Sequence, residues 1–99
     1  MNTYVIRRKD AWNSPEELER VAARSKQVAD DDFPEDIRWI RSYVIAEADG
    51  SLGTVCIYQA SDPEAVRRHA HRVGMPADEI FDVFDTVVIR SDPVNEPAA

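Results

Sequence analysis

Residues 54–74 read TVCIYQASDPEAVRRHAHRVG, and this stretch decides the fold. The run 54–58 is rich in β-branched and aromatic residues, which predicts a strand. Residues 61–64 (SDPE) combine side-chain caps with a proline suited to the first helical position. Apolar residues then recur at helical spacing over 65–73, and Gly74 is a C-terminal stop. A strand therefore leads directly into an amphipathic helix with one buried face.

The first half of the chain repeats this order. Residues 14–17 (SPEE) carry the same cap signature, and the helix that follows is expected to end near the three aspartates 30–32. Residues 49–51 (DGS) predict a hairpin turn. Strands are expected over 3–8, where the turn-like Lys9 and Asp10 end the first one, and over 37–47, 54–58 and 80–89.

The order strand, helix, strand, strand, helix, strand predicts a ferredoxin-like βαββαβ sandwich of the α+β class. In this fold a four-stranded antiparallel sheet carries both helices on one face. We expect one domain over residues 1–90. Residues 91–99 contain two prolines and little to bury, so they are expected to form a flexible tail, or an arm that orders on a partner.

The second face of the sheet predicts a partner. Trp39-Ile40 and residues 55–58 place apolar or aromatic side chains at odd and even positions alike, so both faces of the sheet carry them. A second copy of the chain is the simplest cover for such a face. We therefore expect a homodimer packed sheet to sheet, as in dimeric α/β-barrel assemblies.

Composition limits the function. The 99 residues include 12 Lys and Arg against 19 Asp and Glu, a net charge of −7, which argues against a nucleic-acid-binding protein. No apolar run approaches the length of a membrane span, and the start lacks a signal-peptide pattern, so a cytoplasmic protein is expected. Cys56 is the only cysteine and cannot form an internal disulfide.

Catalytic motifs are missing from the sequence. The three glycines form no phosphate-binding loop, and one cysteine with two histidines cannot build a thiolate zinc site, so a non-catalytic protein is the first expectation. His69 lies on the apolar stripe of the second helix, whereas His71 points to solvent. Two alternatives stay open for His69: a core imidazole bonded to a carbonyl or tyrosine hydroxyl, or a metal ligand or proton-transfer group at a cavity edge.

Polar side chains within the strands suggest a second candidate site. If Arg7, Arg41 and Gln59 converge on a dimer cleft, they would form a cationic pocket for a small carboxylate or phosphate. A period of two places Trp39, Arg41 and Tyr43 on one face of their strand. In the alternative, Arg7, Arg41 and Gln59 are strand-end or edge residues that satisfy one another and the acidic residues Asp82 and Asp85. The candidate ligand-binding residues are Arg7, Trp39, Arg41, Tyr43, Tyr58 and Gln59.

Several stretches together resemble a known family. Residues 4–6 (YVI), 38–44 (RWIRSYV), 56–60 (CIYQA) and 64–78 (EAVRRHAHRVGMPAD) are similar in order and spacing to the small actinobacterial nickel-binding proteins of otherwise unknown function. The resemblance covers almost the whole chain except the tail. It implies a ferredoxin-like homodimer with nickel near the dimer interface, and it makes His69 the candidate metal ligand.

Two positions depart from the family pattern. The family favours glutamate where this chain has Arg7 and Gln59. Replacing two anionic donors by a cation and a neutral amide weakens a divalent site, so this member is a candidate for having lost the metal. The leading hypothesis is a homodimeric nickel-binding protein. The alternative is a dimeric α/β-barrel enzyme or binding protein for a small acidic organic ligand.

Overall fold

The computed structural model describes residues 1–77 and 79–93. Most of the tail predicted over 91–99 therefore lies outside the described residues. The elements in chain order are β1 (Asn2–Trp12), α1 (Pro15–Asp32), β2 (Ile37–Ala46), β3 (Leu52–Ala60), α2 (Pro63–Val73) and β4 (Glu79–Asp82).

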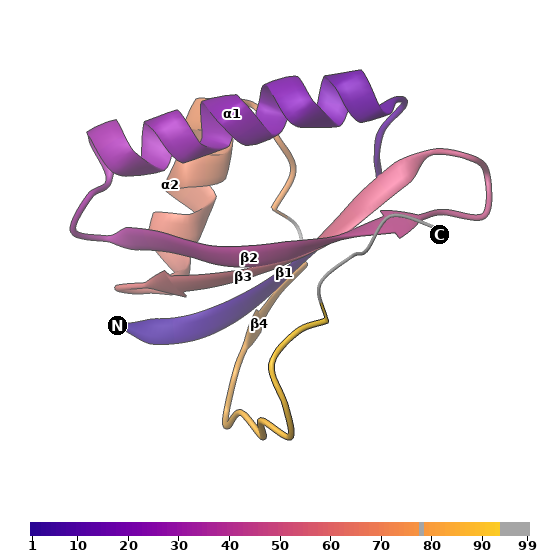
Figure 1. The fold of residues 1–99 in the computed structure, drawn as a ribbon. Coiled ribbons are helices and arrows are strands. Elements are labelled where there is room, and N and C mark those ends of the chain that lie inside the picture. Colours follow the sequence, from indigo (N-terminus) through magenta and orange to yellow (C-terminus); the bar gives the residue numbers. More distant parts are fainter. Residues whose placement is uncertain (78, 94–99) are drawn as a thin grey trace.

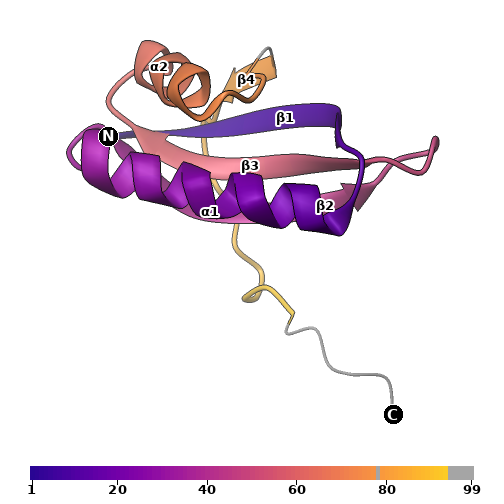
Figure 2. The ribbon, with the colours of Figure 1, turned by 90° about the horizontal axis from the view of Figure 1, so that it is seen from above.

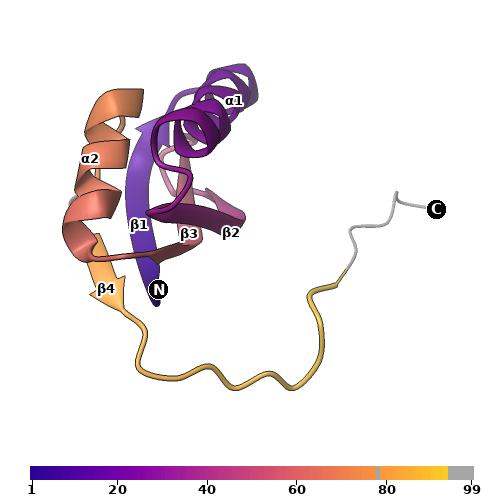
Figure 3. The same ribbon diagram turned by 90° about the vertical axis from the view of Figure 1, so that its left-hand side faces the viewer.

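The four strands form one antiparallel sheet in the order β2-β3-β1-β4. Both helices lie on the same face of it, which confirms the ferredoxin-like α+β fold (Figure 1). Seen from above, α1 runs along the β2 and β3 side of the sheet, and α2 lies beside β1 and β4 (Figure 2). The opposite face, which we call the open face, carries no helix of the described part of the chain (Figure 3).

Local chemistry starts both helices where the sequence predicts. The hydroxyl of Ser14 accepts a hydrogen bond from the amide of Glu17 at 3.1 Å, and the carboxylate of Asp62 accepts one from the amide of Ala65 at 2.8 Å. Each bond satisfies an amide that the helix itself leaves without a partner. Gly74 ends α2 with φ of 88°, a left-handed conformation that glycine adopts without strain.

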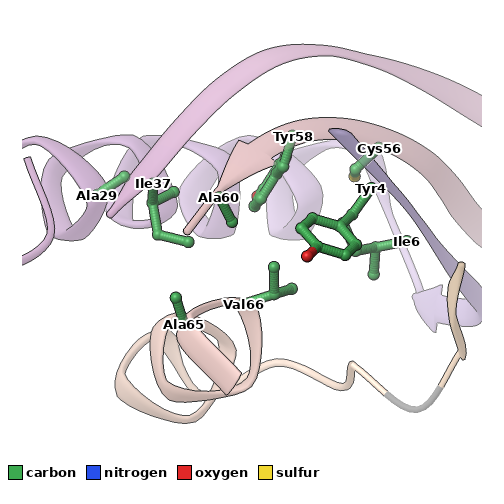
Figure 4. Close-up of a cluster of buried hydrophobic side chains, with 9 residues drawn as sticks. All are labelled: Tyr4, Ile6, Ala29, Ile37, Cys56, Tyr58, Ala60, Ala65 and Val66. Atoms are coloured by element: carbon green, nitrogen blue, oxygen red, sulfur yellow. The ribbon is translucent and has the colours of Figure 1, made fainter. Parts of the chain in front are cut away.

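The core lies between the sheet and the helices. Tyr4 and Ile6 of β1 and Tyr58 of β3 point from the sheet toward Ala65 and Val66 of α2 (Figure 4). All five side chains are at most 2 % exposed. Because even-numbered residues of β1 and β3 face the helices, their odd-numbered neighbours lie on the open face.

The prediction that Lys9 and Asp10 end the first strand is wrong. β1 continues to Trp12, through a register shift between Arg8 and Trp12 where Asp10 takes a φ of 50°. The strand continues because Leu52 at the start of β3 pairs with Trp12 beyond the irregular segment. A bulge of this kind bends a strand without ending it.

The expected shared face of Trp39, Arg41 and Tyr43 is also wrong. A register shift between Trp39 and Arg41 places one extra residue, Ile40, in β2. Trp39 pairs with Tyr58 and lies on the helix side, while Arg41 pairs with Ile57 on the open face. The bulge therefore moves every later side chain of β2 to the opposite face from the one that a strict period of two predicts.

The last strand is shorter than the predicted range 80–89. β4 covers only Glu79–Asp82, and the amide of Val83 adds one hydrogen bond to the carbonyl of Thr3. The pairing of β1 with β4 ends at Tyr4 and Asp82. Residues 83–93, which we call the arm, instead pass across the open-face side of the sheet (Figure 1).

We predict that Asp62→Ala lowers the free energy of unfolding by about 1 kcal/mol, because an amide at the start of α2 loses its acceptor. Urea denaturation followed by circular dichroism measures this change. Asp31→Ala is the matched control, because this exposed acid lies in the last turn of α1, where negative charge is unfavourable. A loss of similar size in both variants would contradict the capping role.

Candidate functional site

The sheet separates the predicted ligand-binding residues into two groups. Trp39 and Tyr58 line a pocket on the helix side. Tyr43 and Gln59 line a hollow of about 490 Å³ on the open face, together with Arg41, which borders both cavities. Arg7 lines neither of them. Within one protomer, the six residues therefore do not line a single cavity.

The open-face hollow is closed on one side by the arm, through Asp85 and Val87. Asp92 attaches the arm to β2: its carboxylate accepts hydrogen bonds from the guanidinium of Arg41 at 3.0 Å and from the hydroxyl of Tyr43 at 2.9 Å. The charge of Arg41 is thus compensated within the protomer. Asp92 was not predicted as a partner of Arg41, because it lies in the predicted tail.

Arg7 is occupied by an ion pair at the hairpin end of the sheet. Its Nη2 donates to both carboxylate oxygens of Glu47, at 2.8 and 3.1 Å. The backbone amide of Asp10 and the Arg7 guanidinium both hold the pKa of Glu47 below its usual value. Gly53 leaves room for the pair, because an added Cβ would lie 2.5 Å from a Glu47 oxygen. Within one protomer, Glu47 therefore compensates the charge of Arg7.

His69 occupies the position of a core imidazole. Its side chain is 0 % exposed, and its Nε2 lies 3.0 Å from the carbonyl oxygen of Ser25. A carbonyl can only accept, so Nε2 carries the proton. The rings of Tyr58 and Phe33 meet it edge-on at centroid distances of 5.7 and 6.1 Å. This geometry matches the first of the two alternatives for His69; its role as a metal ligand stays a prediction.

The remaining nitrogen of His69, Nδ1, is buried and has no hydrogen-bond partner in the structure. Burial lowers the pKa of the ring, since a charged imidazole would lose its hydration. Across residues 1–77 and 79–93, no three His, Cys, Asp or Glu side chains lie close enough to share a metal ion. A complete nickel site is therefore not present among the described residues of one protomer.

Arg8 is the functional candidate that sequence reasoning missed. It is 2 % exposed and lines the helix-side pocket together with Trp39 and Tyr58. The signal was present in the sequence, because a period of two places Arg8 on the same face of β1 as Tyr4 and Ile6, which form the core. A charged residue on the core face of a strand requires an explanation, since burial of a charge is costly without a partner.

We predict that stability falls as the pH is lowered from about 7 to about 5, because the unfolded chain takes up a proton at His69 before the folded chain does. In His69→Gln this pH dependence becomes weaker. Urea denaturation at several pH values measures both slopes. His71→Gln, which changes an exposed ring, should keep the wild-type slope. Equal slopes in wild type and His69→Gln would contradict the buried neutral imidazole.

No helix in the described part of the chain is both long and apolar enough to cross a membrane. A comparison with curated proteins finds no match. Among solved structures, the crystal structure of SCO4226 from Streptomyces coelicolor A3(2) is similar, with a TM-score of 0.67 and 21% sequence identity, covering 86% of this chain and 99% of that chain. At this identity the likeness shows the fold.

A family model gives the assignment. The model described as nickel responsive protein SCO4226-like matches residues 4–83, which include all six strands and helices apart from the first two residues of β1. The match agrees with the order of strands and helices and with the similar crystal structure. This chain therefore belongs to the SCO4226-like family of nickel-responsive proteins.

Proposed function

We propose that the protein is a non-catalytic, nickel-binding homodimer whose two open sheet faces pack together. The observation that carries the proposal is the open face itself, which has exposed apolar residues and a hollow that the arm closes on one side. Tyr43 and Phe81 are 43% and 52% exposed there. The neighbouring Val5 and Ile57 are half-buried and line the hollow. Apolar surface of this kind is typical of an interface between subunits.

The arm supports the same assembly. Phe84 is fully exposed, and Val87, Val88 and Ile89 are between 73% and 80% exposed. Four apolar side chains in six consecutive residues are costly to leave in water. Packing against a second protomer would bury these four side chains. It would also account for the strand-like composition of residues 84–89, which lie outside the sheet of their own protomer.

The nickel part of the proposal depends on family membership and on a shared site. In one protomer the hollow offers the carboxylate of Asp85, the amide oxygen of Gln59 and the hydroxyl of Tyr43. These donors are too few for a tight site, because nickel prefers several imidazole or carboxylate ligands. In a symmetric dimer, each protomer would contribute the same three oxygen donors to the shared site. The residues therefore fit nickel as a site between protomers, with modest affinity.

Arg7 and Gln59, where the family favours glutamate, also indicate a modest affinity for nickel. Arg7 binds the Glu47 carboxylate in two hydrogen bonds and leaves it unavailable to a cation. Gln59 supplies a neutral oxygen where the family favours a charged one. We expect nickel binding to be weaker than in relatives that carry glutamate at both positions.

For the assembly, we predict that the wild-type protein is a dimer at micromolar concentration and that Ile57→Glu is a monomer, because the variant places a charge at the centre of the open face. Analytical ultracentrifugation measures the mass. Gln27→Glu adds the same charge on the exposed surface of α1 and should remain dimeric. A monomeric wild type, or a dimeric Ile57→Glu, would overturn this part.

For the metal, we predict that untagged protein binds nickel in calorimetry and that Asp85→Asn binds it about tenfold more weakly or worse, since a carboxylate ligand is lost. Asp82→Asn is the matched control, because Asp82 borders a different hollow. His69→Gln tests whether the buried imidazole is a nickel ligand. A loss of nickel binding in this variant would mean that the site lies in the core and not on the open face. No binding by the wild type at millimolar nickel would reject a nickel-binding function.

A further inference from the structure

The pocket on the helix side of the sheet shares the lining residues Ile40 and Arg41 with the open-face hollow, but it contains none of the proposed nickel donors. It has a volume of about 430 Å³ and lies between α1 and strands β2 and β3. Most of its wall is apolar. The side chains that line it include Trp12, Leu18, Val21, Trp39 and Met75. This is the size and character of a pocket for a small organic molecule.

One cation is buried in this apolar wall. Arg8 is 2 % exposed; its Nε donates to the carbonyl oxygen of Pro76 at 2.5 Å, and its Nη1 lies 3.3 Å from the sulfur of Cys56. Its Nη2 is buried and has no hydrogen-bond partner. No ion pair among the described residues includes Arg8. A carbonyl and a thiol leave the positive charge without an anion.

A second polar group of the same wall lacks a partner. Thr54 is 3 % exposed, lies opposite Arg8 in the β1–β3 register and also lines the pocket. Its hydroxyl oxygen is buried without a hydrogen bond. Buried polar atoms are rarely left unpaired, so two such atoms on one pocket wall indicate a missing acceptor. That acceptor must be negatively charged to compensate the guanidinium.

We propose that this pocket binds a small monocarboxylate with an apolar body. The carboxylate would accept hydrogen bonds from Nη2 of Arg8 and from the hydroxyl of Thr54. The apolar body would pack against Trp12, Trp39 and Leu18. A metal cation is excluded as the occupant by the guanidinium charge, and a bare inorganic anion would leave most of the apolar wall unfilled.

The proposal is independent of nickel and of the dimer. Arg8 and Thr54 do not line the open-face hollow, and the proposed nickel donors do not line the helix-side pocket, although Arg41 borders both. Arg7 and Arg8 are consecutive residues on opposite faces of β1. Failure of nickel binding at the open face therefore leaves the helix-side pocket intact. The same adjacency provides a matched pair of variants, since each removes one positive charge from β1.

Tryptophan fluorescence provides a direct test. The chain has two tryptophans, and both line the pocket. Untagged protein is titrated at neutral pH with hexanoate and with hexanamide, which has the same apolar body but no charge. We expect a saturable change in emission and a dissociation constant for hexanoate at least about tenfold lower than for hexanamide. Acetate, which lacks the apolar body, should bind more weakly than hexanoate.

Variants assign the effect to the pocket. Arg8→Met should abolish the preference for hexanoate over hexanamide, and Arg7→Met should keep it. Ala22→Phe narrows the pocket without changing its charge and should weaken both ligands. Circular dichroism checks that each variant folds; if Arg8→Met does not, Ala22→Phe still decides whether binding occurs in the pocket.

Three results would overturn the proposal. The first is no saturable change with hexanoate at tens of millimolar. The second is equal affinity for hexanoate, hexanamide and acetate, because charge and apolar body would then have no effect. The third is unchanged hexanoate binding in folded Arg8→Met, or in Ala22→Phe, because the ligand would then bind elsewhere on the protein.

Discussion

The rest of the structure depends on one constraint: both helices pack on the same face of a four-stranded sheet. In this arrangement, one side of each strand faces the helices and the other side lies on the open face. Consecutive residues then have different environments, as Arg7 and Arg8 show. Arg7 meets a carboxylate at the hairpin end of the sheet, whereas Arg8 is buried beneath α1 without one. The open face and the helix-side pocket therefore differ in chemistry because successive side chains of a strand point to opposite faces of the sheet.

The two regions differ in the kind of ligand that we propose for each. The open face combines oxygen donors, a compensated cation and exposed apolar side chains, which suits assembly with a second protomer and a shared cation. The helix-side pocket combines an apolar wall with an uncompensated cation, which suits an organic anion. Arg41 and Tyr43 belong to the open face, and not to the helix side with Trp39, because a bulge at Ile40 reverses the direction of the later side chains in β2.

Much of the fold was predictable from short-range signals. The caps at Ser14 and Asp62, the turn at residues 49–51 and the stop at Gly74 are local, because each depends on hydrogen bonds or dihedral angles within a few residues. The candidate site was less predictable. His69 was correctly placed on the buried stripe of its helix, but the arginine that is buried without an ion pair among the described residues is Arg8 rather than Arg7 or Arg41.

The sequence by itself determined the order of strands and helices, their caps and the buried stripe of α2, since periodicity and capping are properties of neighbouring residues. Only the tertiary structure decided the path of β1 past Asp10, the bulge in β2, the early end of β4 and the attachment of the arm through Asp92. Each of these depends on where a partner strand begins or ends, and on side chains distant in sequence. Pairing between distant segments leaves no local signature, so it becomes visible only in the folded chain.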